Sequence, residues 1–304
     1  MTTIALSTMY AQQKRFDDGE AFARYAAEAG YDAIEVSHST SEEKLRQILD
    51  CGALPVTSIH QPAPHVELPG RKSNADLNIA STNEREQSRA MQHALRSIEW
   101  AAKAGATALV VHLGEVDMAW SGTEAELYRL FRQHGITSNR AAEARAEMET
   151  RRAEAAPANL EAARAALEQL VEAARPHGIV IGLENRLQYH QIPLPDESLA
   201  LLAGFSTAEA GHWHDTGHGE VLDRLGFLPH QEWFDKLGDH LVGAHVHDVR
   251  AVLDHRAPGT AQLDWPMVTA GLASLEAITL EIDQREPDEA VREAPAFLRS
   301  VGFA

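Results

Sequence analysis

The stretch "AAKAGATALVV" at residues 101–111 passes from an alanine-rich segment through a glycine into an apolar, β-branched run. The same order recurs at residues 26–36 ("AAEAGYDAIEV") and 173–183 ("AARPHGIVIGL"). A glycine after the last helical residue is typical of a helix end, and a short β-branched run is typical of a buried strand. Each stretch is therefore interpreted as a helix that leads directly into a strand.

Outward from these junctions, short apolar runs alternate with longer Ala/Glu/Arg-rich segments along the whole chain. Strands are expected at Ile4–Met9, Ala33–Ser37, Val56–His60, Ala108–Leu113, Ile179–Asn185, Gly211–Thr216, Leu241–His247 and Ile278–Asp283. Helices are expected at Gly19–Ala29, Ser41–Asp50, Glu84–Gly105, a long stretch ending near His177, Asp196–Ala203, Gln231–Leu237, Trp265–Leu275 and Asp288–Arg299. Eight strands that alternate with helices predict a single α/β domain over residues 1–304, a (β/α)8 TIM barrel. The alternative is a doubly wound open sheet, which gains no support because the chain has no G-x-G-x-x-G or Walker motif.

Two segments exceed what a minimal barrel needs. Residues 61–83 ("QPAPHVELPGRKSNADLNIASTN") are interpreted as a loop insertion, and residues 115–157, with the charged run "AAEARAEMETRRAEAA", as a helical insertion. Both follow strands, so both are expected at the carboxyl-terminal face, where such barrels place their chemistry. The charged run 138–157 is interpreted as a solvated helix face, with a contact in a homo-oligomer as the alternative.

Composition limits the classes of function. The chain has 27 Lys plus Arg against 45 Asp plus Glu, a formal net charge of −18, which makes a nucleic-acid partner unlikely on electrostatic grounds. No apolar run reaches 18 residues, so no membrane span is expected. The single cysteine, Cys51, and the absence of a signal-peptide pattern favour the cytoplasm.

Polar side chains close seven of the eight expected strands. They are Glu35, His60, His112, Glu184, Asp215 with His218, His245 and Glu281. Residues two apart on a strand share a face, and apolar neighbours such as Leu183 then point outward toward the helices. The polar side chains are therefore expected to point into the barrel and converge at its carboxyl-terminal end.

Four of these residues, Glu184, Asp215, His245 and Glu281, form a mixed oxygen and nitrogen set. Such a set suits one divalent metal ion: Mn²⁺, Co²⁺, Zn²⁺, Fe²⁺ or Mg²⁺. The alternative is a group of buried ion pairs that closes the barrel. The sequence has no matching set of inward Lys or Arg, so a metal site is favoured.

At these residues the sequence resembles the xylose isomerase-like TIM barrels, a family that includes sugar phosphate isomerases and epimerases and also endonuclease IV. The resemblance covers most of the chain. It rests on "LEN" at 183–185, "HDTGH" at 214–218, "HVHD" at 245–248 followed by "DHRAPGTAQLDW" at 254–265, and "LEI" at 280–282.

The resemblance to the epimerase branch implies that Glu184, Asp215, His245 and Glu281 bind the metal and that His218 contacts substrate. It also implies that Glu184 and Glu281 are the catalytic acid/base pair. One would remove a proton beside a carbonyl of a small sugar or sugar derivative to give an enediolate, and the other would return a proton. Whether the product is an epimer or an isomer stays open, and a metal-dependent lyase or dehydratase could use the same first step.

Further residues are candidates for substrate contact: His60, His112, Arg250 and His255. The endonuclease IV branch is the other alternative, a zinc phosphodiesterase that binds three zinc ions and cleaves abasic DNA. His60, His112, the Asp215/His218 pair and His245 match its pattern. Asp254 and His255 depart from it because no residue separates them.

Overall fold

The computed structural model of the protein describes residues 2–71, 73–118 and 122–303. Within these residues, eight strands pair side by side in a closed barrel of order β1-β10-β7-β6-β5-β4-β3-β2, and the pairs in register are parallel. The barrel strands are β1 (Thr3–Ser7), β2 (Ala33–Val36), β3 (Val56–His60), β4 (Ala108–Val111), β5 (Val180–Glu184), β6 (Ala210–Asp215), β7 (Leu241–Val246) and β10 (Ala277–Leu280). The predicted TIM barrel is confirmed, and the open-sheet alternative is wrong.

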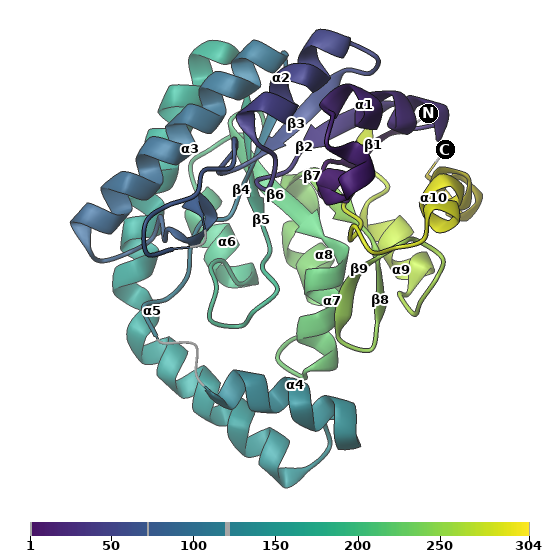
Figure 1. The fold of residues 1–304 in the computed structure, drawn as a ribbon. Helices are drawn as coiled ribbons and strands as arrows, with labels where there is room; N and C mark the ends of the chain where they lie inside the picture. The colour runs from purple at the N-terminus through teal and green to yellow at the C-terminus, as the bar shows by residue number, and fades with distance from the viewer. Residues whose placement is uncertain (1, 72, 119–121, 304) are drawn as a thin grey trace.

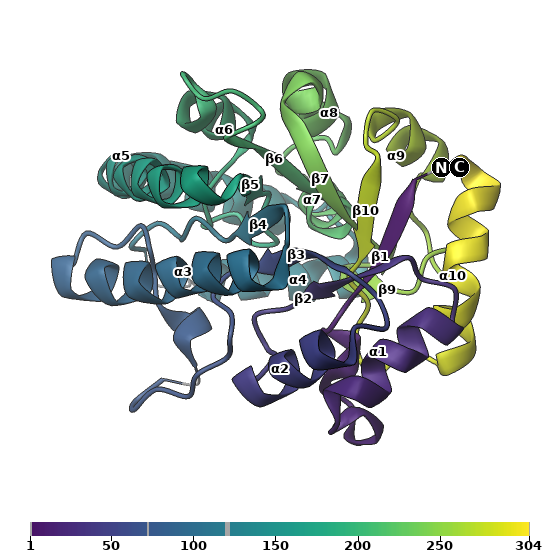
Figure 2. The same ribbon diagram turned by 90° about the horizontal axis from the view of Figure 1, so that it is seen from above.

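Helices surround the strands, as the view along the barrel shows (Figure 2). They are α1 (Gly19–Glu28), α2 (Glu42–Cys51), α3 (Glu84–Ala104), α4 (Gly122–His134), α5 (Asn139–Ala174), α6 (Pro195–Leu202), α7 (Thr216–Arg224), α8 (Gln231–Leu237), α9 (Trp265–Gly271) and α10 (Asp288–Val301). Short 3-10 turns lie at η1 (Tyr10–Gln12), η2 (Lys14–Phe16), η3 (Asn74–Asp76), η4 (Arg175–His177) and η5 (Gly238–His240). The described helices include none with the length and apolar character that a bilayer-crossing segment needs.

The helix–glycine–strand junctions form as expected. Helix α3 ends at Ala104, and Gly105 adopts a left-handed conformation with φ of 70° while its N–H donates to the carbonyl of Ala101. Gly178 has φ of 65° at the corresponding place before β5. Glycine reaches this conformation without a steric penalty, so the chain can leave the helix and enter the barrel within a few residues.

The segments expected as insertions lie outside the ring of barrel strands (Figure 1). Helix α4 and the first turns of α5 pair with each other and pack on α7 and on the region after β7 through a small apolar cluster. The buried members of this cluster are Leu127, Leu130, Ala141, Ala144, Val221, Leu225, Val249 and Val252. In the 61–83 loop, the Asn74 amide donates to the carbonyls of Pro62 (3.2 Å) and Pro64 (3.0 Å) and fixes the loop on itself.

Two elements have no counterpart among the expected ones. Helix α7 follows β6 directly, and Asp215 caps it by accepting from the backbone N–H of His218 at 2.7 Å. Its glycines lower helix propensity, but a Cβ on Gly217 would lie 2.0 Å from the His247 ring, so close packing requires them. The second is an antiparallel pair, β8 (Asp248–Arg250) and β9 (Leu253–Arg256), which follows β7.

Candidate metal centre

Four side chains from four barrel strands meet at one nitrogen atom. The Nδ1 atom of His245 lies 2.8 Å from Glu184 Oε1, 3.3 Å from Glu281 Oε2 and 3.8 Å from Asp215 Oδ2. The alternation of side chains along β5, β6, β7 and the end of β10 turns all four inward, and all four are buried. Three of the predicted quartet of ligands, Glu184, His245 and Glu281, thus lie with His60 in one group whose ligand atoms are all within 4.8 Å of one another. Asp215, the fourth, joins Glu184 and His218 in an adjoining group of the same kind.

The far side of the His245 ring is held by a fifth residue. Its Nε2 atom lies 2.9 Å from Glu35 Oε1, and Glu35 also accepts a hydrogen bond from Ser58 Oγ at 2.7 Å. A carboxylate at one ring nitrogen fixes the orientation of a histidine and leaves its other nitrogen directed at a metal. Glu35 was expected to point into the barrel, but its partner could not be predicted because the contact with His245 joins residues 210 positions apart.

The charges of the quartet suit a cation. Burial opposes ionisation of Glu184, but the imidazoles of His112 and His245 hold the pKa of Glu184 well below its usual range. Burial also opposes a charge on His245, yet Glu35, Glu281 and Glu184 hold its pKa well above its ordinary value. The three buried carboxylates therefore keep a positive charge at Nδ1, and a divalent ion would occupy the same place as a proton.

A divalent metal fits the residues present. Glu281 is 2 % exposed, and its Oε1 atom has no hydrogen-bond partner in the described part of the chain. Leaving a buried carboxylate oxygen unpaired is costly, and coordination to a metal removes that cost. The set of three carboxylates and one imidazole matches the ligands that Mn²⁺, Co²⁺ and Zn²⁺ accept.

Two predicted histidines lie at the second oxygen of Glu184. His112 Nε2 approaches Glu184 Oε2 at 2.6 Å and His60 Nε2 at 3.3 Å. Arg186, which was not among the predicted site residues, also reaches this oxygen at 3.1 Å through Nη1. The sequence indicated a role for Arg186 only through its place two residues after Glu184. Among the described residues, Arg186 is the one arginine that lines the cavities beside the quartet.

The pair that departs from the endonuclease IV pattern, Asp254 and His255, also lies at the site. His218, Asp254 and His255 can present ligand atoms within 4.8 Å of one another. His255 Nδ1 lies 3.0 Å from Asp254 Oδ2, and its Nε2 lies 3.4 Å from Glu281 Oε2. Asp254 and His255 therefore both reach the site, although no residue separates them in the sequence.

His255 reaches this position through an uncommon backbone conformation. Its φ is 54°, its backbone N–H donates to His247 Nδ1 at 2.8 Å, and the two rings stack at 4.2 Å. A non-glycine residue with positive φ carries strain that surrounding contacts must offset. His247 in turn contacts the Asp215 carboxylate at 3.0 Å, so it orients two neighbours and does not face His245 Nδ1.

Arg250 is the one predicted contact residue that the structure places away from this cluster. It ends β8 as an exposed residue, and its guanidinium donates to the carbonyl of Thr260 at 3.0 Å. The reason is the β8–β9 pair, whose formation the sequence did not reveal and whose turn directs Arg250 outward. It lines neither cavity described next.

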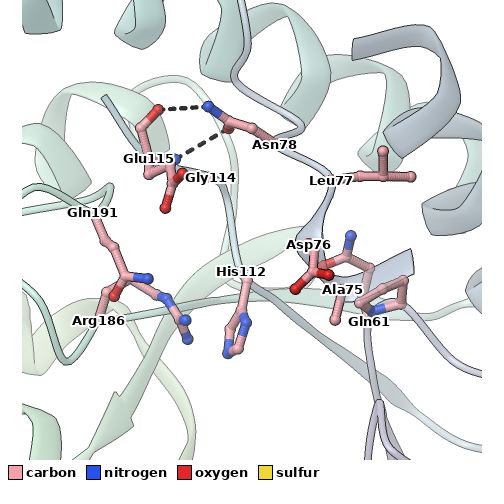
Figure 3. A pocket seen from close by; sticks show the side chains of 11 residues that line it. Gln61, Ala75, Asp76, Leu77, Asn78, His112, Gly114, Glu115, Arg186 and Gln191 are labelled. Carbon is pink, nitrogen blue, oxygen red and sulfur yellow. Dashed lines mark hydrogen bonds between the residues drawn. The ribbon is translucent and has the colours of Figure 1, made fainter. Parts of the chain in front are cut away.

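Two adjoining cavities open beside the quartet. The inner one, about 280 Å³, is lined by Met9, His38, His60, His112, Arg186, Leu187, Gln188, Gln191, His218, His255 and Glu281. The outer one, about 380 Å³, shares His112, Arg186 and Gln191 with it (Figure 3). Cavities of this size lie within the range of about 300–1,000 Å³ that small-molecule sites occupy, or close to it.

Comparison with known proteins agrees with this architecture. The model of the family described as xylose isomerase-like TIM barrel matches residues 23–301. No curated protein sequence matches the chain.

Several solved structures share the fold. A D-tagatose 3-epimerase-like protein aligns with a TM-score of 0.69 at 19% identity over 99% of this chain and 97% of that one. The 3-keto-D-glucoside 4-epimerase YcjR from E. coli aligns at 0.63 and 19% identity over 99% and 100% of the two chains. A D-psicose 3-epimerase from Clostridium cellulolyticum aligns at 0.67 and 13% identity over 99% of each. At such identities the likeness shows a common fold.

Proposed function

Because the chain belongs to the xylose isomerase-like TIM-barrel family, we propose that it is a divalent-metal-dependent isomerase or epimerase of a small sugar or sugar derivative. The observation that carries this proposal is the convergence of Glu184, Asp215 and Glu281 on the Nδ1 atom of His245. The epimerases among the structures of the same fold support the class of reaction.

The four converging residues would hold the metal. When bound, the cation supplies polarisation of a substrate carbonyl and hydroxyl, which acidifies the hydrogen on the adjacent carbon. Glu184 and Glu281 carry the proton transfers: one carboxylate removes the proton and the other returns one. Because both are buried and held anionic, either can act as the base that accepts the substrate proton. The carboxylate that returns a proton must first take one from water, which is how deuterium would enter the product.

The surrounding histidines and Arg186 bind and orient. His60, His112 and Arg186 fix the second oxygen of Glu184, and His218 and His255 line the inner cavity on the side of Glu281. Hydroxyl groups of a sugar can donate to or accept from neutral imidazoles, which His112 and His218 offer because burial lowers the pKa of both.

Deuterium exchange tests the proposal. Protein loaded with Mn²⁺ is incubated with a panel of ketoses in D₂O, and the sugars are analysed by NMR. We expect deuterium at the carbon beside the carbonyl, with loss of exchange after metal chelation. Absence of exchange in every ketose, with loaded and folded protein, would contradict the proposed reaction.

A second candidate is a zinc phosphodiesterase of the endonuclease IV type. The specific observation in its favour is the group His218, Asp254 and His255, which adds a second place for a cation beside the quartet. The net charge of −18 counts against a DNA substrate. Metal content decides between them together with activity: one ion and sugar exchange support the isomerase, whereas three zinc ions and cleavage of an abasic-site duplex support the nuclease.

A further inference from the structure

The outer cavity is a built feature of the protein that the proton transfer does not require. Its walls come from the 61–83 loop, the residues after β4 and the residues after β5. Figure 3 shows these side chains around a common space, with His112 and Arg186 at the boundary to the inner cavity. A substrate bound at the quartet can therefore extend into it.

One wall of the cavity is rigidly fixed. Asn78 Oδ1 accepts from the backbone N–H groups of Ala80 (3.0 Å) and Glu115 (3.1 Å), and its Nδ2 donates to the carbonyl of Glu115 at 2.8 Å (Figure 3). A Cβ on Gly114, whose φ is 109°, would lie 2.4 Å from Asn78 Oδ1. The loop and the end of β4 are thus locked together at a distance that only glycine permits, and the cavity is preformed.

The lining groups favour a neutral ligand with hydroxyl groups. The amides of Gln61 and Gln191 and the carboxylates of Asp76 and Glu115 line the space, whereas the Asn78 amide is held by backbone groups. Arg186 is the one arginine or lysine among the described lining residues. Arg186 is engaged by Glu184. A phosphate or carboxylate placed here would meet two carboxylates, whereas hydroxyl groups can donate to them.

One lining group lacks a partner. Gln61 is 4 % exposed, and its Oε1 atom accepts no hydrogen bond within the described parts of the chain. A buried amide oxygen without a partner is uncommon and costly. Rotation of the Gln61 side chain toward the cavity that it lines would let a ligand hydroxyl donate to this oxygen.

We propose that the outer cavity binds a second sugar ring, so that the substrate is a glycosylated sugar and neither a free monosaccharide nor a sugar phosphate. This inference rests on the proposed isomerase or epimerase function. The reacting sugar lies at the quartet, and its neutral glycosyl substituent lies against Gln61, Asp76 and Gln191.

The test compares four substrates: a free ketose, its 6-phosphate and two glucosyl derivatives. Deuterium exchange by the Mn²⁺-loaded protein is measured with D-fructose, D-fructose 6-phosphate, and 6-O- and 4-O-glucosyl-D-fructose. We expect kcat/KM for a glucosyl derivative to exceed that of free fructose by about tenfold or more, the effect of one well-made hydrogen bond. We expect the phosphate to be the poorest of the series.

A variant tests the location. Ala75 lines the outer cavity and touches neither the quartet nor the inner cavity, so Ala75→Trp should fill the outer space. It should lower kcat/KM for the glucosyl derivative at least severalfold more than for fructose. Ala153→Trp, at an exposed position on α5, is the matched control and should leave the ratio of the two at the wild-type value.

The outcomes separate the two proposals. Equal or faster exchange with free fructose or its phosphate, or an unchanged ratio in folded Ala75→Trp, would overturn the glycoside inference and leave the proposed function standing. No exchange in any member of the series would overturn the proposed function itself.

Discussion

The two faces of strand β6 border two different groups of side chains, and each group contains histidine. Inside the barrel lies the inner cluster, defined by Glu35, Glu184, Asp215, His245 and Glu281. Outside lies the outer stack of His212, His214 and His230, where His212 Nε2 lies 3.2 Å from His214 Nδ1 and His214 Nε2 lies 3.0 Å from His230 Nε2. The two environments meet at consecutive residues of β6, because the side chain of His214 points out of the barrel and that of Asp215 points into it.

The difference between them lies in the partners. The inner cluster surrounds one imidazole with several carboxylates. The outer stack places imidazoles against each other and against aromatic rings, such as Trp233 at 5.5 Å from His212, and the carboxylate of Glu220 contacts only its last member, His230. Burial lowers the pKa of His212 to about 3 and holds that of His214 well below its ordinary value, so these two imidazoles are neutral. A high density of histidines therefore does not by itself indicate a metal site. Several carboxylates around one imidazole, on the same side of the strand, indicate such a site.

The largest expected effect comes from the inner cluster. Glu184→Gln keeps the shape of the side chain but removes the base, so deuterium exchange should fall by about 10²–10⁴-fold, the usual contribution of general acid–base catalysis. NMR detection of exchange measures it. Glu143→Gln, on the exposed side of α5, is the control, and exchange retained by Glu184→Gln would mean that Glu184 is not an acid/base group.

The second-largest effect is expected when the carboxylates that contact a histidine of the inner cluster and of the outer stack are replaced in turn. Glu35→Gln weakens the support of His245 Nε2 and should reduce metal affinity by about 10–100-fold. Glu220→Gln removes the corresponding partner of His230 Nδ1, at 3.1 Å, in the outer stack. Calorimetric titration with Mn²⁺ should show the loss in the first variant only. An equal loss in both would mean that the two regions do not differ in the way described.

The outer stack should make stability depend on acid pH. The folded pKa of His212 is below its unfolded value, so the unfolded chain binds more protons between about pH 3 and 6.5, and stability falls as pH falls through this window. One proton contributes about 1.4 kcal/mol per pH unit. Denaturant unfolding of His212→Phe should therefore show a shallower loss than the wild type, while exposed His177→Gln keeps the wild-type slope.

The smallest effect concerns His190, a buried histidine that belongs to neither the inner cluster nor the outer stack. His190 lies 2.9 Å from Glu124 and 3.4 Å from Glu115. Burial alone would lower the pKa of His190, but these carboxylates raise it to about 9. Its stabilising charge is present below about pH 6.5 and is lost as pH rises through about 9.

We expect His190→Gln to cost about 1 kcal/mol more at pH 6 than at pH 10, a modest figure because Glu115 is half exposed. Urea unfolding at the two pH values measures this difference. A cost that does not change with pH would show that His190 is neutral in the folded protein.

The barrel and the quartet were predictable because their signals are local. Strand alternation places Glu184, His245 and Glu281 inside, and parallel strands bring their carboxyl ends to one face. The observed strands are shorter than expected and end as many as three residues earlier. The alternation that points these side chains into the barrel is unaffected.

Other features depend on contacts between distant segments. The β8–β9 pair turns Arg250 outward, and α7 forms despite Gly217 because the helix must pass close to His247. The support of His245 by Glu35 crosses the barrel. No residue pattern near any of these positions carries that information.

The central claim is that the inner cluster is a cation site centred on His245. Mn²⁺ is titrated calorimetrically into chelator-treated wild type, His245→Asn and His212→Phe, with folding of each checked by circular dichroism. We expect one tightly bound Mn²⁺ per chain in the wild type and in His212→Phe, and loss of this binding in His245→Asn. Wild-type protein that binds no Mn²⁺, or tight binding that survives in His245→Asn, would contradict it.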